Sequence, residues 1–256
     1  MRILPWLARI SFAAFVISLV IGVIAGFGTR FGWWDFRFGL LTLFPWCLYI
    51  GIAAFAVGLV WAVWAMVAND GRGARYGVIG LLGSIAVLAT PLYGIYVAKT
   101  SPMIHDISTD TEHPPQFVAL KNNRPGAMNP PEYDGPKPAA GPDGKKDLTW
   151  KLQKAYYPDI RTVADLTPPA KLFDRAAKAA HAMGWNVVAE VPAEGRIEAT
   201  DTSFWFGFTD DIVIRVKPAG QGARLDIRSK SRVGVSDIGK NAARIRSYLK
   251  TLANTS

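Results

Sequence analysis

The sequence predicts three transmembrane α-helices followed by a soluble α+β domain, built from a helix, a four-stranded antiparallel sheet and a second helix. Three apolar segments of membrane-spanning length occupy most of residues 1–98, since about 20 apolar residues cross the hydrocarbon core of a bilayer. The more polar residues 99–256 change between helical and strand periodicity. We therefore expect a three-helix membrane anchor at 1–98 and one soluble domain at 99–256.

The predicted anchor consists of three helices with short connections, at residues 10–29, 40–68 and 76–98. The sequence Asn69-Asp70-Gly71-Arg72-Gly73 is a turn signal between the second and third helices. The spacing of Gly22 and Gly26 is typical of closely packed membrane helices. No charged residue interrupts a predicted span, which argues against a transporter or channel, because ion and proton pathways usually need intramembrane charges.

Basic residues near the ends of the spans predict the orientation of the anchor. Four fall on the side of the N-terminus and three on the other side: Arg2, Arg9, Arg72 and Arg75 against Arg30, Arg37 and Lys99. Because the more basic side usually stays in the cytoplasm, we expect a cytoplasmic N-terminus and a periplasmic C-terminal domain at a cell inner membrane. Residues 26–30 form a poor signal-peptide cleavage site, so we expect the first span to be retained.

The soluble domain is mildly basic. Residues 99–256 hold 23 of the 29 Lys and Arg and 18 of the 20 Asp and Glu, a net charge of +5. This excess suits a domain close to an anionic lipid surface and is too small for a nucleic-acid partner. The single cysteine, Cys47, lies in a predicted span, so the domain has neither a disulfide nor a thiolate metal site. We expect no cofactor, and as partners the bilayer and an unidentified protein or lipid.

Local signals place the elements of the soluble domain. A Pro- and Gly-rich stretch at 121–147 predicts a long surface loop. Thr167-Pro168-Pro169 predicts a helix start, and Gly184 ends the apolar stripe that follows. Strand patterns then occur at residues 186–191, 196–202, 212–217 and 224–229. A last helix is expected after Ser236 as its N-cap, with Asp237 in the first turn.

The last two strands also predict their own register. Both alternate apolar and polar residues, so one face belongs to the core and the other faces water. Ile214 and Ile227 must lie opposite each other for the apolar sets to share a face, and this register places Arg215 opposite Asp226.

Several segments of the soluble part resemble a bacterial and plastid family known only as domain of unknown function 1499. They are Ile104–Asp110, Pro114–Phe117, Tyr157–Ile160, Phe208–Arg215 and, most distinctively, Arg228–Asn241. The three predicted spans are similar in layout to the membrane anchor of some members. The resemblance implies no established activity, cofactor or catalytic residue.

His105, Asp106, Asp110 and His113 form a dense polar cluster directly after the last predicted span. Histidine and carboxylate side chains can bind zinc or harder metal ions, so a metal-assisted hydrolase that uses His105, Asp106 and Asp110 is one hypothesis. The alternative is a structural cap, because Asp and Thr ahead of Pro114-Pro115 commonly make turn hydrogen bonds. We favour the cap. We interpret Asp210-Asp211 in the same way, as turn residues rather than a catalytic pair.

Two further groups are candidates for contact with lipid or a partner. Phe204, Trp205 and Phe206 lie in an aromatic stretch that suits either core packing or an acyl chain. Arg215 and Arg228, with Lys217, Arg224 and Lys230, are expected on the outer face of the sheet, as solvated charge or as a lipid head-group surface.

No catalytic constellation stands out in the sequence. We therefore expect an integral membrane protein whose extracytoplasmic domain is a non-enzymatic binding or interaction module at the membrane surface. The metal-assisted hydrolase and an envelope lipid-binding protein remain the alternatives.

Overall fold

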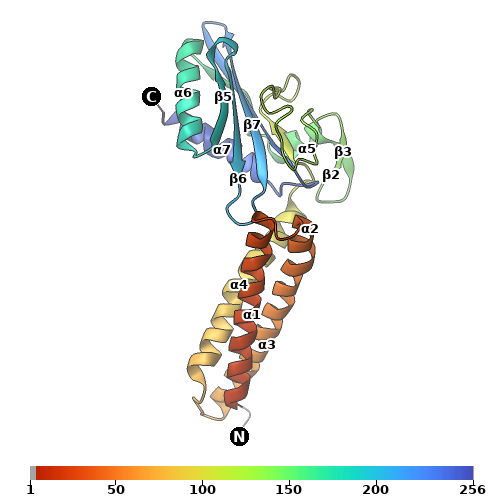
Figure 1. The fold of residues 1–256 in the computed structure, drawn as a ribbon, viewed down its shortest axis with the longest axis vertical. Helices are drawn as coiled ribbons and strands as arrows, with labels where there is room; N and C mark the ends of the chain where they lie inside the picture. The colour runs from red at the N-terminus through yellow and green to blue at the C-terminus, as the bar shows by residue number, and fades with distance from the viewer. Residues whose placement is uncertain (1–3, 256) are drawn as a thin grey trace. The chain divides into compact units, whose positions relative to one another are not determined.

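The computed structural model describes residues 4–255 and divides into two compact units (Figure 1). The first unit contains the chain up to Tyr96 together with Phe204–Gly207, and the second contains Val97–Ser203 and the chain from Phe208 onward. The boundary between them falls inside a helix, after Tyr96.

The first unit contains three helical segments that are long and apolar enough to cross a membrane, as predicted. They are α1 (Leu4–Arg30), the continuous run of α2 (Phe36–Phe38), the π-helix η1 (Gly39–Leu43) and α3 (Phe44–Val67), and α4 (Ala74–Thr100). The second segment begins four residues before its predicted start, because the carboxylate of Asp35 accepts the backbone N–H of Arg37 at 2.9 Å and caps the helix.

Small residues bring these helices close together. A Cβ atom added at Gly22 would lie 3.0 Å from the Sγ atom of Cys47 on α3, and the Ser18 hydroxyl donates to the Cys47 carbonyl at 2.7 Å. Ser11 makes a similar bond to the Ala54 carbonyl at 2.9 Å. The interpretation of Gly22 as a helix-packing residue is therefore confirmed.

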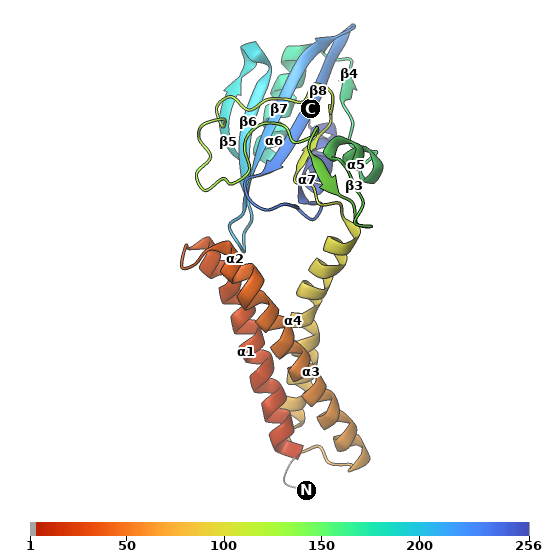
Figure 2. The same ribbon diagram turned by 90° about the vertical axis from the view of Figure 1, so that its right-hand side faces the viewer.

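The second unit is built on a six-stranded sheet in which every observed pair is antiparallel (Figure 2). Its strands are β1 (Asp106–Ser108), β4 (Val163–Asp165), β5 (Asn186–Val191), β6 (Arg196–Thr202), β7 (Thr209–Ala219) and β8 (Gly222–Ser231). The order is β1-β8-β7-β6-β5, and β4 pairs with another part of β8. The four predicted strands are all present. The expected number was too low because β1 and β4 have only three residues each, too few for a period-2 pattern.

The loop predicted at 121–147 contains a small separate hairpin. Its strands are β2 (Pro138–Ala140) and β3 (Lys146–Leu148), which form their own two-stranded sheet. A single 3-10 turn, η2 (Pro192–Glu194), joins β5 to β6. In the central hairpin, Ile214 pairs with Ile227 and Arg215 with Asp226, so the predicted register is confirmed.

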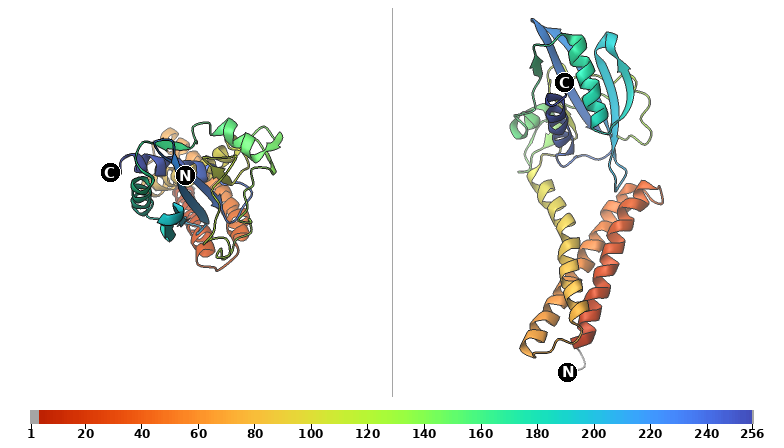
Figure 3. Two further views of the ribbon diagram at one scale, coloured as in Figure 1. Left: turned by 90° about the horizontal axis from the view of Figure 1, so that it is seen from above. Right: turned by 90° about the vertical axis from the view of Figure 1, so that its left-hand side faces the viewer.

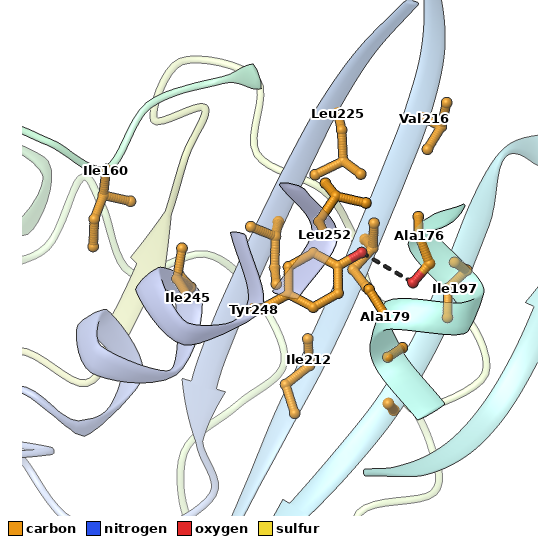
Figure 4. Close-up of a cluster of buried hydrophobic side chains, with 14 of the residues drawn as sticks. Ile160, Ala176, Ala179, Ile197, Ile212, Val216, Leu225, Ile245, Tyr248 and Leu252 are labelled. Carbon is orange, nitrogen blue, oxygen red and sulfur yellow. Dashed lines mark hydrogen bonds between the residues drawn. The ribbon is translucent and has the colours of Figure 1, made fainter. Parts of the chain in front are cut away.

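Helices α6 (Pro169–Ala182) and α7 (Lys240–Ala253) cover one face of the sheet, and α5 (Thr149–Tyr156) lies beside β3 (Figure 3). Their apolar stripes meet those of β6, β7 and β8 in one hydrophobic core. Tyr248 of α7 is central to it: the ring stacks on Trp185 at 5.3 Å between centroids, and the hydroxyl donates to the Ala176 carbonyl at 3.1 Å (Figure 4).

The opposite face of the sheet is covered by residues 109–137, which we call the strap (Figure 2). Phe117 and Leu120 of the strap bury the side chain of Val213 on β7. The expectation of a solvated outer face is therefore wrong for the end of β8, where the side chains of Arg228 and Lys230 are 0 % exposed. Alternation of polar and apolar residues shows which side chains share a face of the sheet, but it does not show whether a segment distant in sequence covers that face.

Candidate functional site

The polar residues between the strap and the sheet form a chain of buried ion pairs. At its centre Arg228 donates from Nε and Nη2 to the two carboxylate oxygens of Asp106, at 2.8 and 2.9 Å. Both side chains are fully buried. The guanidinium also lies 4.8 Å from the ring centre of Phe117 and 5.3 Å from that of Tyr133, both strap residues. The Asp106–Arg228 pair therefore fixes the strap to the sheet.

Lys230 extends this pair to Asp134. Its ammonium group donates to Asp134 Oδ2 at 2.6 Å and lies 3.3 Å from Asp106 Oδ2. His105 Nε2 lies 3.0 Å from the same Asp134 oxygen. Burial alone raises the pKa of the Asp134 carboxyl, but hydrogen bonds from His105, Lys137 and Lys230 outweigh it and hold this pKa well below its ordinary value. Asp134 is thus a charged structural anchor.

Asp110 organises the turn ahead of Pro114-Pro115. Its Oδ1 atom accepts the backbone N–H groups of Glu112 and His113 at 3.1 and 2.8 Å, and its Oδ2 atom accepts Arg215 Nη2 at 3.0 Å. Burial alone would raise the pKa of the Asp110 carboxyl, but these hydrogen bonds and the charge of Arg215 lower it by more, so the net shift of this pKa is downward. His113 itself is exposed. This arrangement is the turn geometry that the cap hypothesis expects.

The structure does not gather the sequence-predicted cluster into a metal centre. His105 and Asp106 meet at the Asp134–Lys230 end of the ion-pair chain, whereas Asp110 points to Arg215. Within residues 4–255, no three His, Cys, Asp or Glu side chains lie close enough together to hold a metal ion.

Arg215 lies at the other end of the covered face. It bridges Asp226, at 2.7 Å on the neighbouring strand, and Asp110, at 3.0 Å in the strap. Only 15 % of the Arg215 side chain is exposed. Arg215 and Arg228 therefore hold the domain together, and of the predicted basic face only Lys217 and Arg224 reach the solvent.

Two further carboxylates complete the buried network: Glu198, which the sequence analysis did not single out, and Asp211, which it assigned to a turn. Glu198 of β6 accepts the backbone N–H groups of Val118, Ala119 and Leu120 at 2.9, 2.9 and 2.8 Å. Asp210 and Asp211 both lie inside β7, not in a turn as expected, and the Asp211 side chain is 0 % exposed. The period-2 alternation of β6 and β7 is a signal that could have placed Glu198 and Asp211 on the polar face of the sheet, but no local signal identifies their partners in the strap.

The aromatic stretch belongs to the first unit. Within that unit Trp205 Nε1 donates to the Val23 carbonyl at 3.3 Å, and the ring of Phe44 lies 5.5 Å from Trp205 and 6.2 Å from Phe206. Phe206 is buried, whereas 78 % of Phe204 is exposed. These three residues thus pack outside the core of the sheet.

The predicted cap is shifted along the chain. Helix α7 begins at Lys240, and its N-cap residue is Gly239 at φ +79°. The Asp237 carboxylate accepts the N–H groups of Gly239 and Asn241 at 2.8 and 3.0 Å, whereas Ser236 accepts only that of Ile238. Asp237 is therefore the capping side chain, and the assignment of Ser236 as the N-cap was wrong.

The family described as "Protein of unknown function (DUF1499)" matches residues 106–252. This match covers more than half of the chain and runs from β1 to α7. The chain belongs to the DUF1499 family. No curated protein matches it.

The DUF1499 region includes both layers of the domain, the apolar core and the ion-paired strap. The segment from Arg228 to Asn241, which carried the resemblance most distinctively, supplies the two buried cations of β8 and the cap of α7. Between them lies an irregular loop at residues 233–239, which we call the exit loop. The DUF1499 description assigns no activity to any of these residues.

Proposed function

We propose that this DUF1499 protein is a non-enzymatic binding module, anchored in a bacterial inner membrane, whose periplasmic domain engages the bilayer surface through the exit loop. The observation that carries this proposal is the exposure of apolar side chains on the exit loop, which is hydrogen-bonded to the residues that directly follow α4. The mild positive charge of residues 99–256 favours an anionic surface as the partner.

The exit loop presents apolar groups in a strained backbone. Val235 is 69 % exposed and Ile238 is 38 % exposed. Ile238 adopts φ +47°, a left-handed conformation that β-branched residues rarely take. Strain of this kind costs of the order of 1–3 kcal/mol and concentrates at functional segments. The loop therefore keeps an unfavourable conformation in which Val235 and Ile238 point outward.

Hydrogen bonds fix this loop to the chain that leaves the membrane. The N–H of Asp237 donates to the Ile104 carbonyl at 3.0 Å, and the Ser236 hydroxyl donates to the Pro102 carbonyl at 3.5 Å. Helix α4 ends at Thr100, and four residues span at most about 14 Å. The head-group layer on each side of a bilayer is roughly 5–8 Å thick, so the exit loop is tied within reach of it.

The state of the polar cluster supports binding over catalysis. Asp106 is held by two buried cations, Arg228 and Lys230, and Asp110 by Arg215 and two backbone N–H groups. A general base or metal ligand needs a carboxylate whose lone pairs are available. These carboxylates instead hold the strap in place, which leaves the surface as the functional part of the domain.

Lipid-borne quenching tests the proposal. In a Cys47→Ala background, an environment-sensitive fluorophore is attached to a Val235→Cys variant, and the full chain is placed in nanodiscs whose lipids carry quenchers near the head group. We expect strong quenching. The control is Leu166→Cys, an exposed apolar site beside Gly222 at the far end of β8, which is about 30 Å from the other end of that strand.

Three outcomes separate the possibilities. Quenching at position 235 and not at 166 supports bilayer contact. Equal and weak quenching at both sites, with the 235 label open to aqueous iodide, rejects it. A 235 label that is shielded from iodide and not quenched by lipid also rejects bilayer contact and identifies a protein partner instead.

A further inference from the structure

A shallow hollow in the strap is lined by four basic or polar residues and four apolar ones, and no carboxylate belongs to its wall. Its walls are formed by Lys121, Asn122, Arg124, Ala127, Met128, Asn129, Pro130 and Pro131. The Asn129 side chain donates to the carbonyls of Ser231 and Gly234 at 3.0 and 2.9 Å. The hollow is thus attached directly to the start of the exit loop.

The charges beneath the hollow are unbalanced. Arg124 donates from Nε to Asp211 Oδ2 at 2.6 Å, and Arg232 donates from Nε and Nη2 to Oδ1 of the same carboxylate at 2.9 and 2.7 Å. Two guanidinium groups therefore share one buried carboxylate. In the neighbouring cluster, by contrast, the two fully buried cations Arg228 and Lys230 have two carboxylates, Asp106 and Asp134, and the third cation on Asp134, Lys137, is exposed.

One nitrogen of the Arg124 guanidinium has no hydrogen-bond acceptor among the described residues. Its side chain is only 5 % exposed, and its Nη1 atom donates to the Asn129 carbonyl at 2.6 Å. The Nη2 atom is buried and has no acceptor among the described residues. Lys121, on the rim, is exposed and forms no ion pair within residues 4–255. A water molecule would satisfy the free donor, but it would leave the excess charge in place.

We propose that this hollow binds a phosphate group, with Arg124 and Lys121 as its two cationic contacts. Guanidinium groups bind phosphate through several parallel hydrogen bonds, and a lysine adds a flexible point charge. The hollow is open and shallow, which suits a single phosphate and not an extended ligand. The inference deepens the proposed function and rests on it for the source of the phosphate, a lipid head group beside the exit loop.

Calorimetric titration of the full chain in a nonionic detergent tests the site without a bilayer. The titrants are inorganic phosphate and dihexanoyl phosphatidylglycerol. We expect both to bind and Lys121→Glu to weaken both by about tenfold or more, since it replaces an attraction by a repulsion. The matched control is Lys171→Glu on α6, at the opposite face of the sheet, which should leave the affinity unchanged. Near-ultraviolet circular dichroism checks that each variant keeps its fold.

A second variant separates the two cations. Arg124→Lys keeps a positive charge beside Asp211 but removes the planar fork with the free Nη2 donor, so it should also weaken phosphate binding. If neither titrant binds, or if Lys121→Glu binds both as well as the wild-type chain does, the phosphate site is rejected, whatever the quenching at position 235 shows. Lipid bound at least tenfold more tightly than inorganic phosphate identifies a head group as the source. The reverse preference identifies a free phosphate or soluble phosphate ester and supports the site without the bilayer.

Discussion

At the scale of single residues, the pair of Asp106 and Arg228 has the largest expected effect on stability. Replacing Asp106 by Asn leaves the buried Arg228 without a carboxylate partner among the described residues and leaves the buried Lys230 with Asp134. Removing one partner of a buried ion pair typically costs about 3–5 kcal/mol. We expect a loss of this size in the free energy of unfolding of Asp106→Asn, measured by urea titration of the detergent-solubilised chain.

The matched control is Asp159→Asn, which breaks the exposed pair of Asp159 and Arg246. Exposed pairs contribute about 0–1 kcal/mol, so the two Asp→Asn changes should differ several-fold. Similar losses in both variants would show that the charge beneath the strap is not the cause.

Asp237 gives the domain a pH dependence of unusual sign. Burial raises the pKa of its carboxyl from 3.8 to about 6, although the N–H groups of Gly239 and Asn241 oppose the shift. The native state therefore holds this proton while the unfolded state releases it, and the contribution of Asp237 to stability falls as pH rises between about 4 and 6. The loss amounts to at most about 3 kcal/mol.

Asp237→Asn should remove this dependence. Urea unfolding of both chains between pH 4 and pH 7 should show the wild type losing stability relative to the variant as pH rises. Asp134 and Asp110, whose pKa values are lowered, act in the opposite direction below about pH 4 in both chains. Parallel stability profiles across this range would contradict the prediction.

The residue pairs that could be predicted from the sequence are those between neighbouring strands of one hairpin, where the alternation of apolar residues sets the register. Arg215 and Asp226 follow from alternation across a short hairpin, and they pair as expected. Asp106 and Arg228 are 122 positions apart and meet because β1 adds to the edge of β8. The partners of Asp211 are Arg124 in the strap, 87 positions away, and Arg232 directly after β8, 21 positions away. No local periodicity encodes such contacts.

At the scale of elements, the strap is the feature whose role could not be predicted from its composition. Pro and Gly correctly predict that 121–137 lacks regular structure, but Arg124 and Asp134 of this stretch form ion pairs with buried residues of the sheet, so it is not a free surface loop. Helices α6 and α7 and the four long strands were predictable because each repeats its pattern over six residues or more. An irregular segment has no such pattern, so its position on the sheet is known only from the buried side chains that bind it.

Glu198 is the anchor whose loss should release the strap locally. Its carboxylate accepts three backbone N–H groups, from residues 118 to 120. Hydrogen bonds to a charged group contribute about 1.5–3 kcal/mol each. In Glu198→Gln we expect amide hydrogen exchange at these residues to accelerate by roughly tenfold or more, with the β7–β8 hairpin unchanged.

Glu194→Gln is the control for this exchange measurement. Glu194 and Glu198 both form ion pairs with Arg196, but the Glu194 side chain is largely exposed and is not bonded to the strap amides of residues 118–120. Its exchange pattern at residues 118–120 should match that of the wild type. Acceleration in both variants would assign the effect to Arg196, and no acceleration in Glu198→Gln would show that other contacts hold the strap.

At the scale of the whole molecule, the division into a unit of membrane-length apolar helices and an α+β unit follows directly from the sequence. Apolar segments of membrane length are suited to a lipid environment, whereas segments that alternate polar and apolar residues are suited to water on one face. Composition alone therefore separates the two parts of the chain. The DUF1499 match begins at residue 106, just after α4 ends, and leaves all three membrane-length segments outside it. The side of the membrane on which the domain works follows only from the distribution of basic residues.

Cysteine labelling decides this orientation. In a Cys47→Ala background, Lys145→Cys places a thiol in the exposed turn of the β2–β3 hairpin, and Gly71→Cys places one in the connection between α3 and α4. Gly71 has open space around the position of a new Cβ atom, so the substitution should not disturb the helices. We expect the two sites on opposite sides of the membrane, because α4, which separates them along the chain, is long and apolar enough to cross it.

A membrane-impermeant maleimide is then added to Gram-negative cells with a permeabilised outer membrane and an intact inner membrane. We expect labelling of Lys145→Cys, and labelling of Gly71→Cys only after lysis. The opposite pattern would place the domain in the cytoplasm. Contact of the exit loop with the bilayer would still be possible in that case, because its distance from the end of α4 does not depend on orientation. The phosphate groups within reach of the strap would then be those of the cytoplasmic leaflet, so this measurement determines which lipid compositions the binding experiments must reproduce.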